Sequence, residues 1–251
     1  MRDESAWAEG LRDRHDPVLL VVSPPRCAST ALARCFWGHP RFRWYSHEPF
    51  DRWYHENAGL GDVAQALREP LDVGEPGARG LVVKEMTFQA GEHLATLAAT
   101  ATLPVLVPVR DPRLAVMSRM RQRERSGEPP AFPSAESGWQ NLADALEAFR
   151  AKGIEHVVAD VTAFRREPGP CLAQLCARLG LAGDDRMSSW KPVPGLCLGR
   201  LGGAQDLWYE RVLGSSGIEP PDERVPEVDE FPKLMRAHLA MAMELYRSLT
   251  A

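Results

Sequence analysis

The sequence predicts an α/β protein, a three-layer sandwich in which helices cover both faces of a mainly parallel sheet of four or five strands. Short apolar, β-branched runs recur at 18–22, 80–86 and 103–109. They lack the polar alternation of a strand with one wet face, as is typical of buried parallel strands. Between and after them lie segments with apolar residues at helical spacing, such as 137–151 and 168–181. Strands alternating with helices in this way favour this architecture.

The composition is that of a globular protein and narrows the function classes. The chain has 251 residues, of which 44% are apolar and 25% charged, enough for one domain with a substantial core. Its 30 basic and 34 acidic residues argue against a nucleic-acid partner. No apolar run approaches ~20 residues, so no membrane span is expected. We expect a single domain over 1–251, with 1–16 forming a surface helix or a frayed terminus.

The cysteines and histidines indicate a reduced protein without a catalytic metal. The five cysteines are Cys27, Cys35, Cys171, Cys176 and Cys197. Their number is odd, their spacing matches no zinc site, and the sequence shows no secretion signal. These features predict reduced thiols and a cytoplasmic location. The seven histidines form no HExxH or comparable cluster, so no metal is expected.

The segment 18–37 carries the first candidate binding site. A buried strand, 18–22, ends at two prolines, and a short polar loop leads into a helix that Ser29 or Thr30 can cap. A strand, a short loop and a helix amino terminus can hold an anion, and Arg26 adds a side-chain donor. The segment contains no glycine and no lysine, unlike a nucleoside-triphosphate loop. The alternative is an ordinary strand–turn–helix with a solvated Arg26.

A second candidate anion site lies at 110–118. Arg110 stands at the end of the third strand, whose two prolines predict an edge position or a bulge. Asp111 and Pro112 then suit the cap and the first turn of a helix, and Ser118 follows two turns later. Six arginines fall within 110–125, which indicates an anionic ligand. The alternative is a solvated, arginine-rich helix face.

Charged residues also end the other predicted strands. His47 and Glu48 precede Pro49 at the end of a short strand, where ligand groups collect in parallel α/β sheets. They are therefore candidates for a general base, although an exposed loop pair without a role is equally compatible with the sequence. Lys84, near the end of the run 80–86, can reach a phosphate or sulfuryl oxygen, or it can be a surface lysine.

Two of these motifs resemble those of sulfotransferases that use 3′-phosphoadenosine 5′-phosphosulfate (PAPS). The loop Pro25-Arg26-Cys27-Ala28-Ser29-Thr30 is similar to the family's 5′-phosphosulfate loop, although Ser-Gly is commoner where Cys27-Ala28 stands. The segment 110–118 is similar to the family's 3′-phosphate motif, with Arg and Ser eight residues apart and Asn/Asp-Pro after the Arg. The motifs also occur in the family's order. The resemblance implies a P-loop nucleotide-hydrolase-like fold that binds PAPS, with 3′-phosphoadenosine 5′-phosphate (PAP) as product.

The resemblance also implies roles for the residues of the candidate site. In one group of bacterial sulfotransferases a Glu-Pro element follows the first helix and its Glu lies near the acceptor hydroxyl, the place of Glu48 here. Lys84 would stabilise the bridging oxygen, and Arg26 would neutralise the leaving phosphate. Met86 replaces the histidine of cytosolic animal members, which leaves Glu48, His47 or Glu85 as the base.

The late segment 190–218 resembles the part of the family that closes over the adenine and the 3′-phosphate. It is rich in glycine and aromatic residues, and Arg200 is its candidate for contact with the donor. The loop around 127–138 is the candidate cover of the acceptor.

The function predicted from the sequence is therefore sulfuryl transfer from PAPS to a hydroxyl, or an amine, of a small molecule, with Glu48 as the base. Two other classes stay open. One is a nucleotide or small-molecule kinase with a divergent phosphate loop, which would need Mg²⁺ and normally a lysine in the loop. The other is a non-catalytic nucleotide-binding protein. The sequence does not identify the acceptor, the pathway or the oligomeric state.

Overall fold

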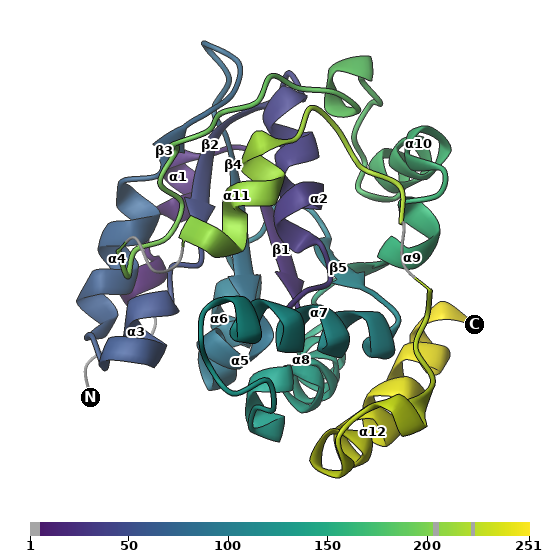
Figure 1. The fold of residues 1–251 in the computed structure, drawn as a ribbon. Coiled ribbons are helices and arrows are strands. Elements are labelled where there is room, and N and C mark those ends of the chain that lie inside the picture. Colours follow the sequence, from purple (N-terminus) through teal and green to yellow (C-terminus); the bar gives the residue numbers. More distant parts are fainter. Residues whose placement is uncertain (1–5, 203–205, 222–223) are drawn as a thin grey trace.

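The computed structural model describes residues 6–202, 206–221 and 224–251, which contain a six-stranded sheet (Figure 1). The strands are β1 (Val18–Ser23), β2 (Phe42–His47), β3 (Leu71–Asp72), β4 (Gly80–Met86), β5 (Val105–Val109) and β6 (His156–Asp160). Their spatial order is β3-β2-β4-β1-β5-β6, and β3 alone runs antiparallel to its neighbour. The sheet is therefore mainly parallel, as the sequence predicts, and its parallel strands end at the lower edge in Figure 1.

Strand β1 lies between β4 and β5, and the alternation of its side chains builds the two cores. Val18, Leu20 and Val22 pack into one apolar cluster, whereas Leu19 and Val21 pack into another on the opposite face. All six residues of the strand are buried. Because successive strand residues point to opposite faces, an uninterrupted apolar run requires helices on both sides.

The helices divide between the two faces of the sheet. The first cluster receives side chains from α1 (Leu11–Arg14), α4 (Leu60–Arg68), α5 (Thr87–Ala90), α6 (Leu94–Ala98), α7 (Pro112–Arg125), α8 (Trp139–Lys152) and α12 (Lys233–Thr250). The second receives them from α2 (Ser29–Cys35), α9 (Val161–Phe164), α10 (Pro168–Arg178) and α11 (Asp206–Gly214). The predicted three-layer α/β arrangement is thus confirmed. None of the described helices combines the length and apolar character that a membrane-spanning helix needs.

Three local predictions were wrong. The sheet has a sixth strand, β3, because two residues are too few to produce a pattern in the sequence. The proline-containing β5 is not an edge strand but lies between β1 and β6. The pairing of β5 with β1 is limited to Val21 and Leu106. Pro108, which has no N–H to donate, is therefore tolerated on this side of the strand. The N-cap of α2 is Ala28, in the left-handed conformation, rather than Ser29 or Thr30.

Two segments are more ordered than the sequence indicates. Of the predicted surface helix or frayed terminus at 1–16, residues 1–5 lie outside the described residues. The remainder forms a 3₁₀ turn and α1, anchored by the buried side chains of Trp7 and Leu11. Residues 51–79 contain four glycines and two prolines, yet they form α3 (Asp51–Glu56) and α4, followed by β3. The structure pairs none of the five cysteines in a disulfide.

Gly138, the N-cap of α8, lies at a close junction and provides a stability test. Its φ is 71°, its carbonyl accepts a hydrogen bond from Thr87, and an added Cβ would lie 2.8 Å from the Cδ of Pro25. We expect Gly138→Ala to lower the free energy of unfolding by roughly 1–3 kcal/mol, because it adds strain and overpacking. Gly153→Ala, at a similar φ but in open space, is the matched control in urea denaturation. Equal losses of unfolding free energy in the two variants would show that the close contact of Gly138 with Pro25 does not add to the cost.

Candidate active site

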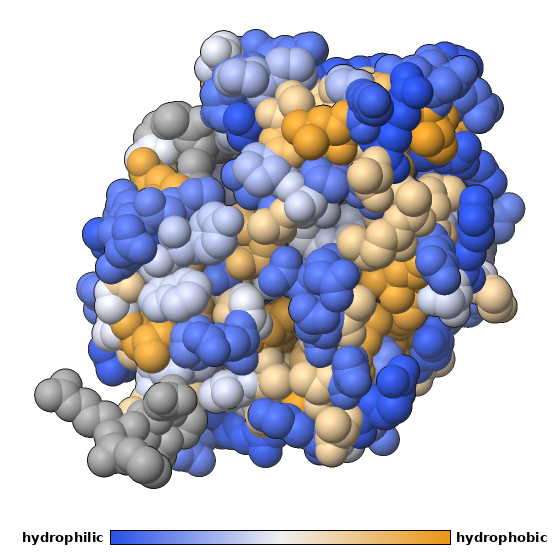
Figure 2. Space-filling view, turned by 90° about the horizontal axis from the view of Figure 1, so that it is seen from below, coloured by the Kyte–Doolittle hydropathy of each residue, from blue (hydrophilic) through white to orange (hydrophobic). Residues whose placement is uncertain are grey.

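A cavity of ≈ 620 Å³ opens at the edge where the parallel strands end. It is lined by the β1–α2 loop, the residues after β2, β4 and β5, the helix α7, and α11, which lies across the sheet (Figure 1). Figure 2 views this edge from below and shows apolar residues between hydrophilic ones in the middle of the face. The topology thus brings the predicted strand-end motifs to one cavity.

One end of the cavity joins the two predicted anion motifs. Pro25, Arg26, Ala28, Ser29 and Thr30 line it together with Arg110 and Ser118. The Nε of Arg26 donates to the Oγ of Ser118 at 3.3 Å, and Arg110 donates to the carbonyl of Arg26 at 3.4 Å. Segments some 90 residues apart are therefore in direct contact. Arg26 and Ala28 both have positive φ, 64° and 51°, so the loop turns sharply around this end.

This end of the cavity carries an excess of positive charge. Among the described residues, no carboxylate lies within ion-pair distance of Arg26. Burial, together with the neighbouring Arg110 and Arg119, lowers the pKa of Arg26 to about 10. A guanidinium in this position is stabilised by an anion that brings its own charge. The geometry therefore suits a phosphate- or sulfate-containing ligand.

Trp208 of α11 lies between two of these arginines. The guanidinium of Arg26 lies 5.4 Å from the centre of its ring, and that of Arg119 lies 5.8 Å from it. Such cation–π contacts hold the arginine side chains in place without neutralising them. Trp208 and Tyr209 were not among the predicted site residues.

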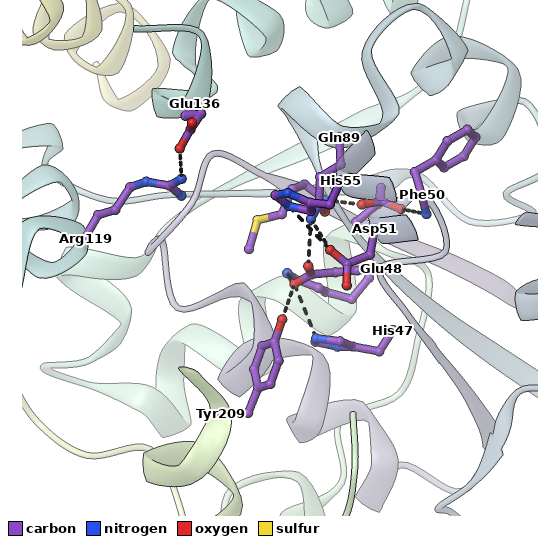
Figure 3. A network of polar contacts seen from close by, with 12 residues as sticks. His47, Glu48, Phe50, Asp51, His55, Gln89, Arg119, Glu136 and Tyr209 are labelled. Carbon is purple, nitrogen blue, oxygen red and sulfur yellow. Dashed lines mark hydrogen bonds and ion pairs between the residues drawn. The ribbon is translucent and has the colours of Figure 1, made fainter. Parts of the chain in front are cut away.

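At the other end of the cavity, Glu48 forms the centre of a buried polar network (Figure 3). Glu48 is only 2% exposed and has a positive φ of 45°. Its backbone N–H donates to the carbonyl of Lys84 at 2.7 Å, and its carboxylate forms an ion pair with the Nζ of Lys84. Strands β2 and β4 are neighbours with His47 opposite Lys84, which explains how the two predicted residues meet.

Two further hydrogen-bond donors, and one imidazole nitrogen that makes no hydrogen bond to the described residues, lie at the same carboxylate. The hydroxyl of Tyr209 donates to Oε1 at 3.1 Å, and the amide of Gln89 donates to Oε2 at 3.2 Å. The Nε2 of His47 lies 3.3 Å from Oε1. Burial raises the pKa of Glu48, but Lys84 and His47 more than offset this and hold the pKa well below its usual range. Glu48 is therefore a carboxylate at neutral pH.

The other two candidate bases have different environments. Glu85 does not line the cavity, and its carboxylate accepts hydrogen bonds from the backbone N–H groups of Phe50 and Met86, at 2.9 and 2.7 Å. Burial and the nearby Glu48 raise its pKa well above the usual range. Because both of its oxygens accept from the backbone and it does not line the cavity, Glu85 is unsuited to accept the proton of an acceptor. Burial lowers the pKa of His47, which is therefore neutral.

Beyond Glu48 the cavity wall combines aromatic side chains with internally paired charges. Arg119 donates to Glu136 at 2.5 Å and lies over the rings of Phe88 and Phe132, at 5.6 and 4.9 Å (Figure 3). His55, 39% exposed at its side chain, lines the same region. This wall lines the same cavity as Glu48, so it is suited to hold the body of a second substrate.

The sequence comparison matches the carboxyl-terminal part of this molecule to a known family. Residues 136–251, a little under half of the chain, match the model of the sulfotransferase domain. In this part the chain is similar to the sulfotransferase domain. The loop at 25–30, Glu48, Lys84 and the motif at 110–118 precede the matched region, so the match does not bear on them. No curated protein sequence matches the chain.

One solved sulfotransferase domain shares the fold. The sulfotransferase domain from the Synechococcus PCC 7002 olefin synthase superposes with a TM-score of 0.54 at 16% identity, over 93% of this chain and 95% of that one. The sulfotransferase domain from the curacin biosynthetic pathway gives 0.49 at 17% identity, over 93% and 98%. The sulfotransferase from Alicyclobacillus acidocaldarius gives 0.47 at 15%, over 70% and 87%. At 16% identity the first similarity shows the fold alone.

Four of the predicted site residues do not line the cavity: Cys27, His47, Lys84 and Arg200. Arg200 does not line it, because its guanidinium pairs with Asp62 at 2.7 Å and so fastens the segment 190–202 to α4. The role predicted for Arg200 as a donor ligand finds no support in this geometry. Residues 203–205 of the predicted covering segment lie outside the described residues. Cys27 points away into the first apolar cluster, and burial raises its pKa to about 12.

Four other residues of this site were not predicted from the sequence. Tyr209 and Gln89 donate to Glu48, and Trp208 and Arg119 line the cavity. The spacing of Trp208 and Tyr209 within an aromatic, glycine-rich segment was the one available signal for them. Within the described part of the chain, no group of three or more His, Cys, Asp and Glu side chains could hold a metal ion.

Proposed function

We propose that this sulfotransferase transfers a sulfuryl group from PAPS to a hydroxyl, or less readily an amine, of a small-molecule acceptor. The observation that supports this most directly is that one cavity combines anion-binding groups with a buried carboxylate. Arg26, Arg110 and Ser118 line it together with Glu48, whose ion-pair partner Lys84 is fully buried and does not line it. A donor with a 3′-phosphate and a 5′-phosphosulfate needs donors for both anions, and the loop 25–30 and the Arg110–Ser118 motif would supply them.

In the proposed reaction the acceptor oxygen forms a bond to sulfur while the bond between sulfur and the bridging oxygen of the 5′-phosphate breaks. The electron pair of that bond stays on the phosphate, where Arg26 and Lys84 supply positive charge. The acceptor proton goes to a carboxylate oxygen of Glu48. Sulfuryl transfer resembles phosphoryl transfer in its demand for in-line positioning and charge neutralisation, and both are supplied here by side chains.

The Lys84–Glu48 pair gives this mechanism an internal dependence on the donor. While Lys84 donates to Glu48, the pKa of the carboxyl is well below its usual range and Glu48 is a weak base. If Lys84 turns toward the leaving oxygen, Glu48 loses its strongest partner, and burial then raises its pKa. Base strength would increase only when the donor is in place.

Binding of PAP tests the donor assignment. We expect PAP to bind without Mg²⁺ more tightly than ATP with Mg²⁺, and Arg110→Ala to weaken PAP binding about 10- to 100-fold through loss of a charge-assisted hydrogen bond. Arg125→Ala, which replaces an exposed arginine at the end of α7, is the control. The measurement is isothermal titration calorimetry.

Three outcomes would contradict the proposal. Preference for ATP with Mg²⁺ would favour a kinase. Tight PAP binding combined with no transfer to any compound in a hydroxyl and amine panel would favour a non-catalytic nucleotide-binding protein. PAP bound equally well by Arg110→Ala would show that the anion site lies elsewhere.

A further inference from the structure

Two residues of β2 extend the network behind Glu48, away from the cavity. Tyr45 and His47 are two positions apart on the strand, so their side chains share a face of the sheet. The hydroxyl of Tyr45 lies 2.5 Å from the Nδ1 of His47, and the Nε2 of His47 lies 3.3 Å from Oε1 of Glu48. Tyr45 is fully buried and His47 is 5% exposed. Figure 3 shows the ring of His47 pointing toward Glu48.

The buried environment of Tyr45 and His47 determines which of their atoms carry a hydrogen. Burial raises the pKa of Tyr45 well above its usual range, so its hydroxyl keeps the proton at neutral pH. Burial lowers the pKa of His47, so the imidazole is neutral and only one of its nitrogens carries a hydrogen. Among the described residues, Nδ1 of His47 is the hydrogen-bond partner recorded for the Tyr45 hydroxyl. The O–H therefore donates to Nδ1, and the imidazole hydrogen is on Nε2.

We infer that Tyr45 is a positioning residue, which fixes His47 in the Nε2–H form so that this N–H, rather than a lone pair, lies 3.3 Å from Oε1 of Glu48. The inference rests on the proposed function of Glu48 as the base. In the opposite tautomer the lone pair of Nε2 would face the carboxylate, and the two would repel each other. No proton of the reaction passes through His47 or Tyr45.

The arrangement explains why a neutral donor stands beside Glu48. The other groups that face this carboxylate are Lys84 from β4, Gln89 from α5 and Tyr209 from α11. If Lys84 turns to the leaving oxygen, the remaining three donors carry no charge. They hold the carboxylate in its orientation while opposing its protonation less than a cation would. The site would thus keep its geometry and gain basicity in the same step.

Nuclear magnetic resonance tests the tautomer without any need for activity. In long-range ¹H–¹⁵N spectra of the histidine rings, His47 of the full chain is expected to show a protonated Nε2 and an unprotonated Nδ1, with the signals assigned by their loss in His47→Gln. We expect Tyr45→Phe to shift His47 toward the Nδ1–H form. A protonated Nδ1 in the wild-type protein, or an unchanged spectrum in Tyr45→Phe, would overturn the inference.

Kinetics then separate positioning from a general structural effect. We expect Tyr45→Phe to lower kcat about tenfold while KM and PAP affinity stay within about twofold, since the carboxylate is misplaced rather than lost. In a His47→Gln background the loss should disappear, because a glutamine amide supplies a donor that has no tautomer to set. Tyr246→Phe, which removes a hydrogen-bonded hydroxyl between α12 and β6, is the control.

An equal loss from Tyr45→Phe in both backgrounds would overturn the inference, because the hydroxyl would then act independently of His47. If the protein transfers no sulfuryl group to any acceptor, the proposed function fails, and the resonance experiment alone decides whether Tyr45 sets the tautomer. The two failures are therefore distinguishable.

Discussion

Replacing Lys84 by methionine is expected to abolish most activity and to destabilise the protein at neutral pH. Lys84 is fully buried. Its ammonium group pairs with the carboxylate of Glu48, whose side chain is only 3% exposed. Breaking such a pair leaves an uncompensated buried charge, which costs about 3–5 kcal/mol of the free energy of unfolding. Loss of a donor to the leaving group is expected to lower kcat about 10²- to 10³-fold. Urea denaturation and single-turnover transfer measure the two effects.

The pH dependence of stability identifies the origin of this loss. In the wild-type protein the pKa of Glu48 is lowered by folding, so its contribution to stability is present above the usual pKa of about 4.3 and is lost as the pH falls through the folded value. Without Lys84, burial raises the pKa of Glu48. The contribution then reverses, and stability falls as the pH rises from about 4 to 7.

The double variant Lys84→Met/Glu48→Gln is the matched control for this prediction. It removes both charges, so we expect it to recover much of the stability and to lose the reversed pH dependence while it remains inactive. If Lys84→Met were as stable as the wild-type protein at pH 7, or if the double variant were no more stable than Lys84→Met, the buried ion pair would not be the cause.

The strand-end residues of this site could be predicted because they depend on local sequence. An apolar run followed by a polar residue places Lys84, Glu48 and Arg110 at one edge of any parallel sheet. The contact between Lys84 and Glu48 is different, because it requires β2 and β4 to be neighbours. Strand order follows from the packing of the whole chain, and the sequence of either strand alone does not contain it.

The residues that the sequence analysis missed come from elements that only the tertiary structure brings to the site. Tyr209 donates to Glu48 across 161 positions of sequence, and it does so because α11 packs over the sheet. An aromatic residue in an amphipathic helix gives no local sign of such a role, since the same pattern serves ordinary core packing. Arg200 shows the converse. Its segment resembled a donor-binding one, yet the nearby carboxylate of Asp62 pairs with it.

Replacing Glu48 by glutamine is expected to lower kcat about 10²- to 10⁴-fold, the usual range for loss of a general base. Glutamine keeps the size of the side chain and an oxygen that accepts from Tyr209, but it cannot accept the acceptor's proton. PAP affinity should stay within about twofold, because Arg110 and Ser118 hold the donor at the other end of the cavity. The measurement is single-turnover sulfuryl transfer over a range of pH, alongside PAP titration as the test of folding.

The matched variant is Glu85→Gln, since Glu85 is also a buried carboxyl group on the neighbouring strand. Glu85 does not line the cavity, and its oxygens accept from the backbone N–H groups of Phe50 and Met86, so we expect the change to affect stability rather than kcat. In the wild-type protein, activity should decline only in acid, because the lowered pKa of Glu48 must be crossed before the base is lost. Should Glu85→Gln be inactive and Glu48→Gln active, the two carboxyl groups would have opposite roles, and Glu48 would serve only as the partner of Lys84.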